Sequence, residues 1–445
     1  MKVILIGAGE VGYYLAKKLI QENHDLYIID NNPDKVERVS ETLDAIVIHG
    51  NGASQNVLES VGAKDADILI AASSIDEVNI LSCLIGKEVG VKNTVARVRS
   101  REFLKEGSVI NKEKYGIDLI VHPEKVTADE IIKLIYYPYT SKIVDFGGGK
   151  LTIAAIKIKN NSRIVGKSII EVTSQASNNF LCLCIERDGK TIIPHGDDVF
   201  IENDTIYVIS NIKDLKGVLK TIFPEYKEQQ NIMIYGASSI GKMVAEKISE
   251  DLNVKLIEGN KEDAKQAAEE LLDTLILLGE GTDIELLTSE QIEFMDSFIA
   301  VSDNEESNLL AALLAKYLGV KRTIAHINTN DYIPIISKLG IDSVISKNIA
   351  TANAIMKFMR RGRIISVSLF EGIDAEAIEL VPREKSYATK KPIKDLGLHR
   401  DILIGAIIRN NEVIIPKGDT IIEPDDNVVV FTKPYLIGKV EKYFN

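Results

Sequence analysis

The chain has few cysteines and no pattern that would make them functional. Its 445 residues include three, Cys83, Cys182 and Cys184, which are too few for a disulfide framework, and none has Cys-x-x-Cys spacing. Cys182 and Cys184 alternate with Leu181 and Leu183, which favours buried or half-buried strand positions over a redox pair. We therefore expect a cytoplasmic protein.

Long hydrophobic runs and an excess of basic charge are also missing. No stretch approaches the roughly 18 apolar residues of a membrane span, and the apolar run at 3–6 is too short for a signal peptide. Acidic residues outnumber basic ones, 65 to 53, which argues against nucleic acid or an anionic membrane surface as the main partner. What is present is ample apolar side chain, 45% of the residues, enough for two to four packed domains.

A glycine-rich turn follows the first strand-like run. Residues 2–6 have an apolar strand pattern, GAGEVG follows, and an apolar helical pattern comes next. In such a G-x-G-x-x-G turn, the first glycine allows the tight turn, the second lets a pyrophosphate approach, and the third permits close helix packing. The predicted phosphate site comprises Gly7, Ala8, Gly9, Glu10, Val11 and Gly12.

An acidic residue ends the second strand-like run. Residues 26–29 lead into Asp30, 23 positions after Gly7, close to the spacing of the acid that holds ribose hydroxyls. Asn31 and Asn32 follow instead of an arginine, so NAD(H) or an adenine nucleotide is favoured over NADP(H). A turn of the same shape that holds no ligand is the alternative.

The whole pattern occurs twice. Residues 67–98 resemble residues 296–327 at an offset of 229, and Gly7 then maps to Gly236 and Arg97 to His326 without a gap. A pattern of short alternating strands follows each copy. With turn or charge signals at 147–149, 224–229 and 360–363, the predicted domains are 1–142, 143–226, 230–362 and 363–445.

The second copy departs from the first at its glycine turn. It reads GASSIG, with Ser238 where Gly9 stands, and keeps an acid as Glu258. A side chain at the point of closest approach would weaken pyrophosphate binding, whereas the two serine hydroxyls could bond a phosphate. Both readings stay open for the predicted residues Gly236, Ser238, Ser239, Gly241 and Glu258.

With these motifs in place, the chain resembles the RCK (KTN) regulators of potassium transport. The resemblance rests on GAGEVG with Asp30, on SIDEVN, on ARVR and on GIDLIVHPEKVTADEI, and it covers nearly all of the sequence. It implies an α/β fold with two Rossmann-like, doubly wound parallel-sheet domains, each followed by a small α+β RCK C-subdomain. It also implies a cytosolic homotetramer that binds NAD(H), ADP or ATP. That assembly would gate a membrane-embedded potassium channel or transporter subunit of the Trk type, as a peripheral protein on the inner face of the cell membrane.

Further positions complete the expected nucleotide site of the first copy. Arg97 and Arg99 alternate on a strand that ends near the crevice, so one of them should face the ligand. The resemblance implies that this position senses phosphate or interface charge, while a surface ion pair is the alternative for Arg99. The added cofactor-binding residues are Asn51, Gly52, Ala72, Ser73, Arg97 and Arg99.

Nothing in the sequence points to a reaction site, so we do not expect an enzyme. Tyr14 and Lys18 have the spacing of a reductase pair but fall on the helix after the glycine turn, where they share one face. His49, His122 and His195 have no acidic or metal-binding cluster around them in the sequence. The alternatives from other classes are a soluble NAD-dependent oxidoreductase and a sensor of another ligand, for example a cyclic dinucleotide, through the small domains.

Acidic residues open one predicted helix in each copy. A divalent cation could bind there, but acids at a helix start also complement its dipole, and the second reading is preferred. We therefore predict no metal site at Asp76, Glu77, Glu305 and Glu306.

Overall fold

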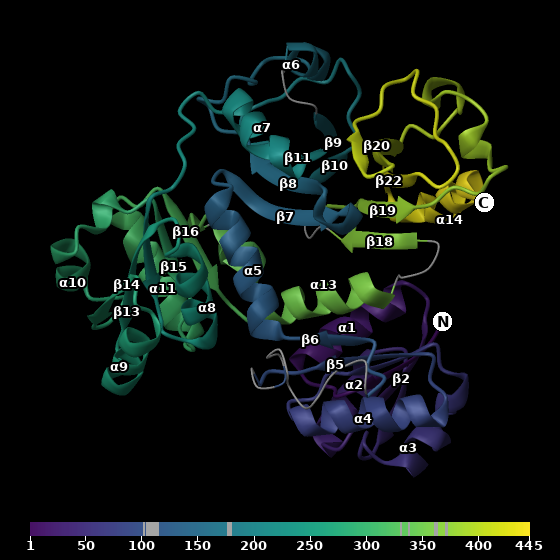
Figure 1. Cartoon of the computed structure of the whole chain (residues 1–445), viewed down its shortest axis with the longest axis horizontal. Helices are drawn as coiled ribbons and strands as arrows, with labels where there is room; N and C mark the ends of the chain where they lie inside the picture. Colours follow the sequence, from purple (N-terminus) through teal and green to yellow (C-terminus); the bar gives the residue numbers. More distant parts are fainter. Residues whose placement is uncertain are drawn as a thin grey trace. The chain divides into compact units, whose positions relative to one another are not determined.

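A computed structural model of the chain describes residues 1–100, 103, 115–175, 180–329, 332–336, 339–359, 364–369 and 373–445. The predicted boundary at 360–363 lies outside the described residues. The chain forms two compact units, each assembled from two separate stretches (Figure 1). The first unit comprises Met1–Ile131 with Asn231–Met359, and the second comprises Ile132–Gln230 with Arg360–Asn445.

A six-stranded parallel sheet forms the first half of unit 1, in the order β3-β2-β1-β4-β5-β6. Its strands are β1 (Lys2–Ile6), β2 (Asp25–Asp30), β3 (Ile46–His49), β4 (Ile68–Ala71), β5 (Asn93–Arg97) and β6 (Leu119–Val121). The helices are α1 (Glu10–Gln21), α2 (Pro33–Thr42), α3 (Gln55–Ser60), α4 (Asp76–Val89) and α5 (Pro123–Tyr136). Every residue of β4 is buried, as expected where helices cover both faces of a parallel sheet. The strand order reverses between β1 and β4, which is where such sheets bind ligands.

The second half of unit 1 repeats this topology, in the order β14-β13-β12-β15-β16-β17. Its strands are β12 (Asn231–Tyr235), β13 (Asn253–Glu258), β14 (Thr274–Leu278), β15 (Ser297–Ala300), β16 (Arg322–His326) and β17 (Ser343–Ile345). The helices are α8 (Ser239–Ile248), α9 (Lys261–Glu270), α10 (Ile284–Ser289), α11 (Glu305–Tyr317), α12 (Ile333–Ile336) and α13 (Lys347–Met359). The predicted duplication of a Rossmann-like domain is confirmed.

The repeat is not gapless as predicted, because one pair of equivalent strands departs from the offset of 229. Ile6 pairs with Ile29 in the first sheet and Tyr235 with Ile257 in the second, so β2 and β13 lie 228 residues apart. The register of the next strand restores 229. The one-residue deletion lies between α8 and β13, because a connecting loop tolerates a deletion that the strand register does not.

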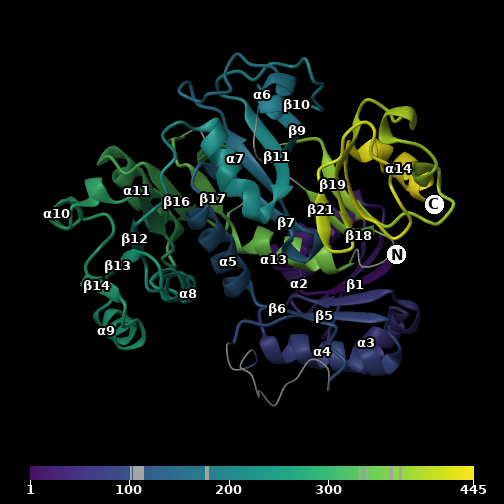
Figure 2. The same ribbon diagram turned by 45° about the horizontal axis from the view of Figure 1, so that its top comes forward.

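Helix α13 follows the second sheet in sequence but packs on the first. Its residues Ala352, Ile355 and Met356 belong to the same buried cluster as Val3 and Leu15 of the first half. Figure 1 shows α13 beside α1, Figure 2 shows α13 above β6 of the first sheet, and α13 contacts both elements. This helix therefore ties the two halves of unit 1 together.

Unit 2 contains two five-stranded antiparallel sheets, in the orders β10-β9-β11-β8-β7 and β18-β19-β22-β20-β21. The first is built from β7 (Thr140–Phe146), β8 (Leu151–Lys157), β9 (Phe180–Arg187), β10 (Lys190–Ile192) and β11 (Thr205–Asn211). The second is built from β18 (Ile364–Leu369), β19 (Glu376–Leu380), β20 (Ile402–Arg409), β21 (Glu412–Ile414) and β22 (Asn427–Thr432). The helices are α6 (Ile169–Gln175), α7 (Leu215–Ile222) and α14 (Ile437–Phe444). Leu183 and Phe431, one from each sheet, lie in one buried cluster, so the two small domains share a core.

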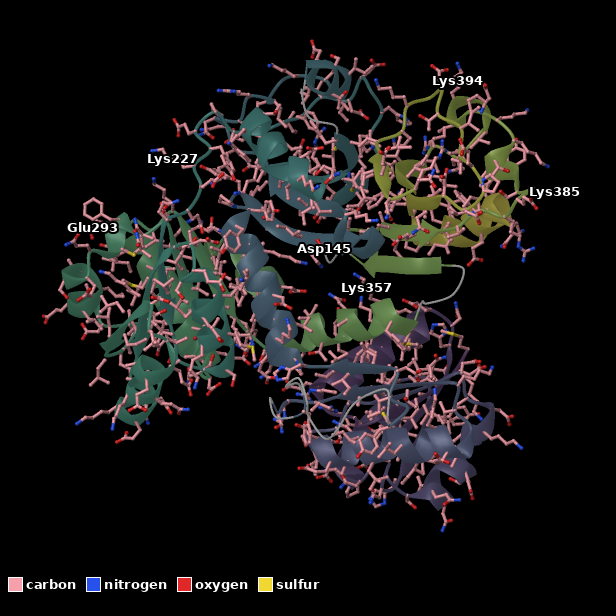
Figure 3. The ribbon with its side chains drawn as sticks, viewed as in Figure 1. Asp145, Lys227, Glu293, Lys357, Lys385 and Lys394 are labelled. Atoms are coloured by element: carbon pink, nitrogen blue, oxygen red, sulfur yellow. The ribbon has the colours of Figure 1, made fainter. Side chains whose placement is uncertain are left out.

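Two details of unit 2 bear on the sequence predictions. Cys182 and Cys184 are buried on β9, as expected, and burial raises the pKa of the Cys184 thiol to about 12. The predicted boundary at 142/143 falls inside β7, where Asp145, labelled in Figure 3, forms an ion pair with Lys133 of α5. Thr140 and Lys142 of β7 already pair with β8, so the small sheet begins before that boundary.

Across the described ranges, no helix combines the length and the apolar character that crossing a bilayer requires.

Candidate functional site

Two glycines of the first turn are required by the fold itself. Gly7 has a positive φ of 98°, and a Cβ there would lie 2.7 Å from the backbone nitrogen of Ser73. A Cβ on Gly12 would lie 1.8 Å from the carbonyl oxygen of Gly7. Since neither position has room for a side chain, β1, the turn and α1 pack closely, as the sequence predicted.

Gly9 is different, because nothing lies within 4 Å of the position its Cβ would take. It is the N-cap residue of α1, and no side chain caps the first turn of that helix. The start of α1 therefore carries the positive end of the helix dipole beside open space. This combination suits an anion such as a pyrophosphate.

Asp30 stands next to this turn at the end of β2 and is 8% exposed. Its Oδ2 accepts a hydrogen bond from the backbone N–H of Ala8 at 2.6 Å, and its Oδ1 accepts one from Asn32 at 2.8 Å. Each oxygen keeps a further acceptor site. The carboxylate is thus fixed by the backbone while it remains able to accept from a ribose hydroxyl.

A crevice of about 350 Å³ opens at this switch point. Ten predicted residues line it: Gly7, Gly9, Glu10, Val11, Asp30, Asn51, Gly52, Ala72, Ser73 and Arg97. Three others do not line it. Ala8 anchors Asp30, Gly12 packs beneath the turn, and the exposed Arg99 donates to the carbonyl oxygen of Ser74 at 2.6 Å. The strand β5 ends at Arg97, and of the two predicted arginines Arg97 is the one that reaches the crevice, whereas Arg99 follows the strand.

Arg97 is held by its surroundings. Its Nη1 donates to the carbonyl oxygen of Ser73 at 3.4 Å. Burial lowers its pKa and Arg99 lowers it further, while Glu124, Asp76 and Glu10 oppose the shift. Because an arginine starts from such a high pKa, the group keeps its positive charge at neutral pH.

Asn79 of α4 fixes the loop that follows β4. Its amide nitrogen donates to the carbonyl oxygens of Ser73 and Arg97, at 3.0 and 2.8 Å, and its Oδ1 accepts from the backbone N–H of Ser73 at 2.9 Å. Asn308 makes the same three contacts with Ser302 and His326 in the second half. Asn79, whose counterpart in the second half is Asn308, therefore positions the wall of the crevice.

Sequence reasoning missed several lining residues, above all Asn348 from the start of α13. Its amide nitrogen donates to Oε2 of Glu10 at 2.8 Å and to the carbonyl oxygen of Asn328 at 3.4 Å. Lys35 of α2 also lines the crevice. No spacing signal links Asn348 to a glycine turn more than 300 residues earlier, because only the packing of α13 on the first sheet brings them together.

The second glycine turn has the same backbone but a different helix start. A Cβ on Gly236 or Gly241 would clash as in the first half, and Glu258 accepts from the backbone N–H of Ala237 at 2.7 Å. Ser238, however, caps α8: its hydroxyl accepts from the N–H of Gly241 at 3.2 Å and donates to the carbonyl oxygen of Val301. Ser239 is the first residue of α8.

The remaining candidates are accounted for by local contacts. Tyr14 and Lys18 lie on one face of α1, with the ammonium 5.6 Å from the ring centroid. Nε2 of His49 lies 3.0 Å from the carbonyl oxygen of Asn31, and Nδ1 of His122 lies 3.5 Å from Oε2 of Glu124.

The acids that open the helices also have local roles. Asp76 accepts from the backbone N–H groups of Arg99 and Ser100, and Glu305 accepts from that of Thr329. Within the described ranges, no three His, Cys, Asp or Glu side chains gather where they could hold a metal ion.

Two domain families match this chain, each of them twice. The TrkA-N domain matches residues 3–123 and 232–347, and the TrkA-C domain matches residues 153–222 and 378–445. The Trk system potassium uptake protein TrkA homolog of Archaeoglobus fulgidus is 36% identical over 445 residues, with 100% of both chains covered. The Trk system potassium uptake protein TrkA of Vibrio alginolyticus is 33% identical over 452 residues, with 100% of this chain and 98% of that protein covered.

Solved structures show the same fold. The crystal structure of the GsuK RCK domain superposes with a TM-score of 0.63 at 18% identity, covering 100% of this chain and 94% of that one. The GsuK channel bound to NAD gives a TM-score of 0.64 at 18% identity, covering 100% of this chain and 78% of that one. The predicted likeness to RCK proteins is confirmed, and with both domain models matched twice and relatives above 30% identity over the full length, the chain belongs to the TrkA family.

Proposed function

We propose that the chain is a nucleotide-binding regulatory subunit of a potassium uptake system. NAD(H), ADP or ATP binds in the crevice at the start of α1, and the chain acts on a membrane-embedded Trk-type channel or transporter subunit. The observation that carries the proposal is an uncapped helix start beside a fixed carboxylate, Asp30, in a crevice of about 350 Å³. The link to potassium uptake comes from the names of full-length relatives.

The route from ligand to partner begins at the rim of the crevice. Asn348 lines the crevice and belongs to α13, whose apolar face is buried against the first sheet. A nucleotide that contacts Glu10 or Asn348 changes the hydrogen bond between them. To gate a partner, the ligand must bind two arrangements of the chain with different affinity, and a coupling of about 1–3 kcal/mol is typical.

The lining residues support binding rather than turnover. Among the described residues that line the crevice, none is His, Tyr or Cys. Asp30 and Arg97 are tied to backbone groups. Hydride-transferring enzymes usually place an acid or base beside the nicotinamide. These tied side chains, together with the names of the full-length relatives, favour a regulatory subunit over an oxidoreductase.

Assembly into a cytoplasmic homotetramer at the inner face of the membrane is part of the proposal. Leu81 on α4 and Leu310 on α11 hold equivalent places in the two halves and are 47% and 52% exposed. Exposed leucines at the same place in both halves are suited to contacts between chains. Membrane attachment then comes from the transporter subunit, because a net charge of -12 gives no attraction to anionic lipid.

Calorimetric titration of NADH, NAD, ADP and ATP into the full chain tests the binding step. We expect at least one of them to bind with micromolar-range affinity, and Asp30→Asn to weaken the binding of that nucleotide by about tenfold or more. Asp30→Asn keeps one of the two side-chain acceptors that bond Ala8 and Asn32, so thermal unfolding should show a folded chain with a loss of stability of about 1–3 kcal/mol. Absence of binding by all four nucleotides, or an unchanged affinity in the variant, contradicts the site.

A further inference from the structure

We propose that the second Rossmann-like half keeps its crevice filled by its own side chains, so that each chain binds one nucleotide, in the first half. This inference rests on the proposed function, because it assigns the nucleotide of that function to one of two repeated crevices. Three differences between the halves carry it: a tyrosine in place of an isoleucine, a serine cap in place of an open helix start, and a reversal of charge.

Tyr235 ends β12 at the place where Ile6 ends β1. Its ring packs on Gly281, where a Cβ would lie 2.3 Å from the ring, just as Ile6 packs on Gly52. The tyrosine is longer, and its hydroxyl donates to Oε2 of Glu280 at 3.0 Å. The residue is 5% exposed, so most of its surface is covered by the protein.

The hydroxyl of Tyr235 reaches toward the wall of the second crevice. Burial and the hydrogen bond to Glu280 raise the pKa of Tyr235, while Ser302 and Ser307 lower it. Glu280 occupies the position of Asn51, which lines the open crevice of the first half. The phenol is thus bonded to a residue at the wall of the space that is open in the first half.

Ser238 closes the phosphate end of the same crevice. In the first half nothing lies near the would-be Cβ of Gly9, and no side chain caps α1. In the second half the Ser238 hydroxyl accepts from Gly241 and donates to Val301. Because its single proton already serves Val301, this hydroxyl has no donor left for a phosphate. The reading in which it would bond a phosphate is therefore not supported.

Charge also favours the first crevice. Lys35 and Arg97 line that crevice, and the corresponding positions of the second half hold Asp263 and His326. Burial and the nearby Lys347 lower the pKa of His326 to about 4, so the ring is neutral at pH 7. The two cations that would attract an anionic ligand are thus absent from their equivalent positions.

Acidic groups add to this difference. Glu280 replaces the neutral Asn51, and its carboxylate lies over Gly259, where a Cβ would be 2.2 Å from Oε1. Glu258, the counterpart of Asp30, directly precedes Gly259 in the sequence. Two carboxylates oppose the entry of a pyrophosphate.

The stoichiometry of nucleotide binding to the full chain tests the inference. We expect about one nucleotide per chain by titration of NADH and ADP, strong weakening in Asp30→Asn, and unchanged binding in Glu258→Gln. Two nucleotides per wild-type chain, or binding lost in Glu258→Gln but kept in Asp30→Asn, overturns it. Absence of any binding contradicts the proposed function and, with it, this assignment.

A gain-of-binding variant tests the same inference independently. The triple change Tyr235→Ile, Ser238→Gly and Glu280→Asn installs the side chains that the first half carries at these positions. If circular dichroism and urea unfolding show a folded chain, the variant should bind a second nucleotide, and a folded variant that still binds one contradicts the role assigned to these three residues. If the variant does not fold, the comparison of Asp30→Asn with Glu258→Gln still decides the question.

Discussion

Gly9 and Gly12 belong to the same turn but have different roles. Gly12 lies so close to the carbonyl oxygen of Gly7 that any side chain would displace the backbone, whereas Gly9 faces empty space. The fold therefore requires Gly12, whereas Gly9 leaves room for the proposed ligand. The motif predicts these two roles, and the surroundings of each glycine agree with them.

Because of this difference, alanine at Gly12 should lower stability, whereas alanine at Gly9 should lower nucleotide affinity. Gly12→Ala should lower the free energy of unfolding by about 1–3 kcal/mol through overpacking. Gly9→Ala should change it by no more than about 1 kcal/mol, the scale of an N-cap preference. The second variant should nevertheless lose nucleotide affinity, because its methyl group points into the crevice. Urea unfolding and calorimetry measure both quantities, and a stable Gly12→Ala with normal binding would refute the distinction.

Asn79 and Asn308 form a matched pair for a second test. Each is fully buried, and Asn79 makes three hydrogen bonds while Asn308 makes four, so alanine at either position should cost about 2–4 kcal/mol of stability. Asn79→Ala should also weaken nucleotide binding, because Ser73 and Arg97 line the crevice. Asn308→Ala serves as the control, with a similar loss of stability and unchanged affinity for the nucleotide.

His326 makes stability depend on pH. Its pKa is about 4 in the folded chain, because burial and Lys347 lower it against the opposing effects of Glu305 and Asn328. An unfolded histidine titrates near 6.5, so the unfolded state binds more protons below that pH and stability falls as the pH falls. Between pH 7.5 and 5 the wild type should lose about 2 kcal/mol more than His326→Gln. Urea unfolding at both pH values measures this, and parallel pH profiles would argue against a buried neutral ring.

Among the elements, the strands and turns of the sheets could be predicted, and the placement of α13 could not. Apolar runs that end in a glycine turn or in Asp30 predict parallel strands, and the internal repeat predicts a second copy. The helical pattern of 347–359 shows an apolar face but not which sheet covers it. That choice depends on long-range packing, which leaves no trace in local spacing.

The packing of α13 leads to a prediction of its own. Ile355 is fully buried in the core of the first sheet, so Ile355→Ala should cost about 2–5 kcal/mol of stability. The loosened helix should also weaken nucleotide binding through Asn348. Lys357→Ala, at an exposed position of the same helix, should cost no more than about 1 kcal/mol and should leave binding unchanged. Equal effects of the two changes would show that α13 does not depend on this contact.

For the whole molecule, sequence reasoning identified the fold and most of the first crevice but not its far wall. The glycine turn and Asp30 are local signals, and residues such as Asn51 and Ser73 follow strand ends whose meeting place the topology dictates. Asn348 and Lys35 carry no such signal. The sequence already set the second copy apart at Ser238 and left its binding of a nucleotide open, and the hydrogen bonds of Tyr235 and Ser238 add contacts that no spacing indicated. The domain boundaries, the tetramer and the choice among nucleotides remain predictions.

Potassium flux through a reconstituted Trk-type transporter subunit is the most direct test of the central claim. The full chain would be added to proteoliposomes with and without NADH, NAD, ADP or ATP, and Asp30→Asn would serve as the site control. We predict that at least one nucleotide changes the flux several-fold with the wild-type chain and has a much weaker effect with Asp30→Asn. A flux that depends on the chain but is the same with every nucleotide, or an undiminished response in Asp30→Asn, would contradict regulation through the first crevice.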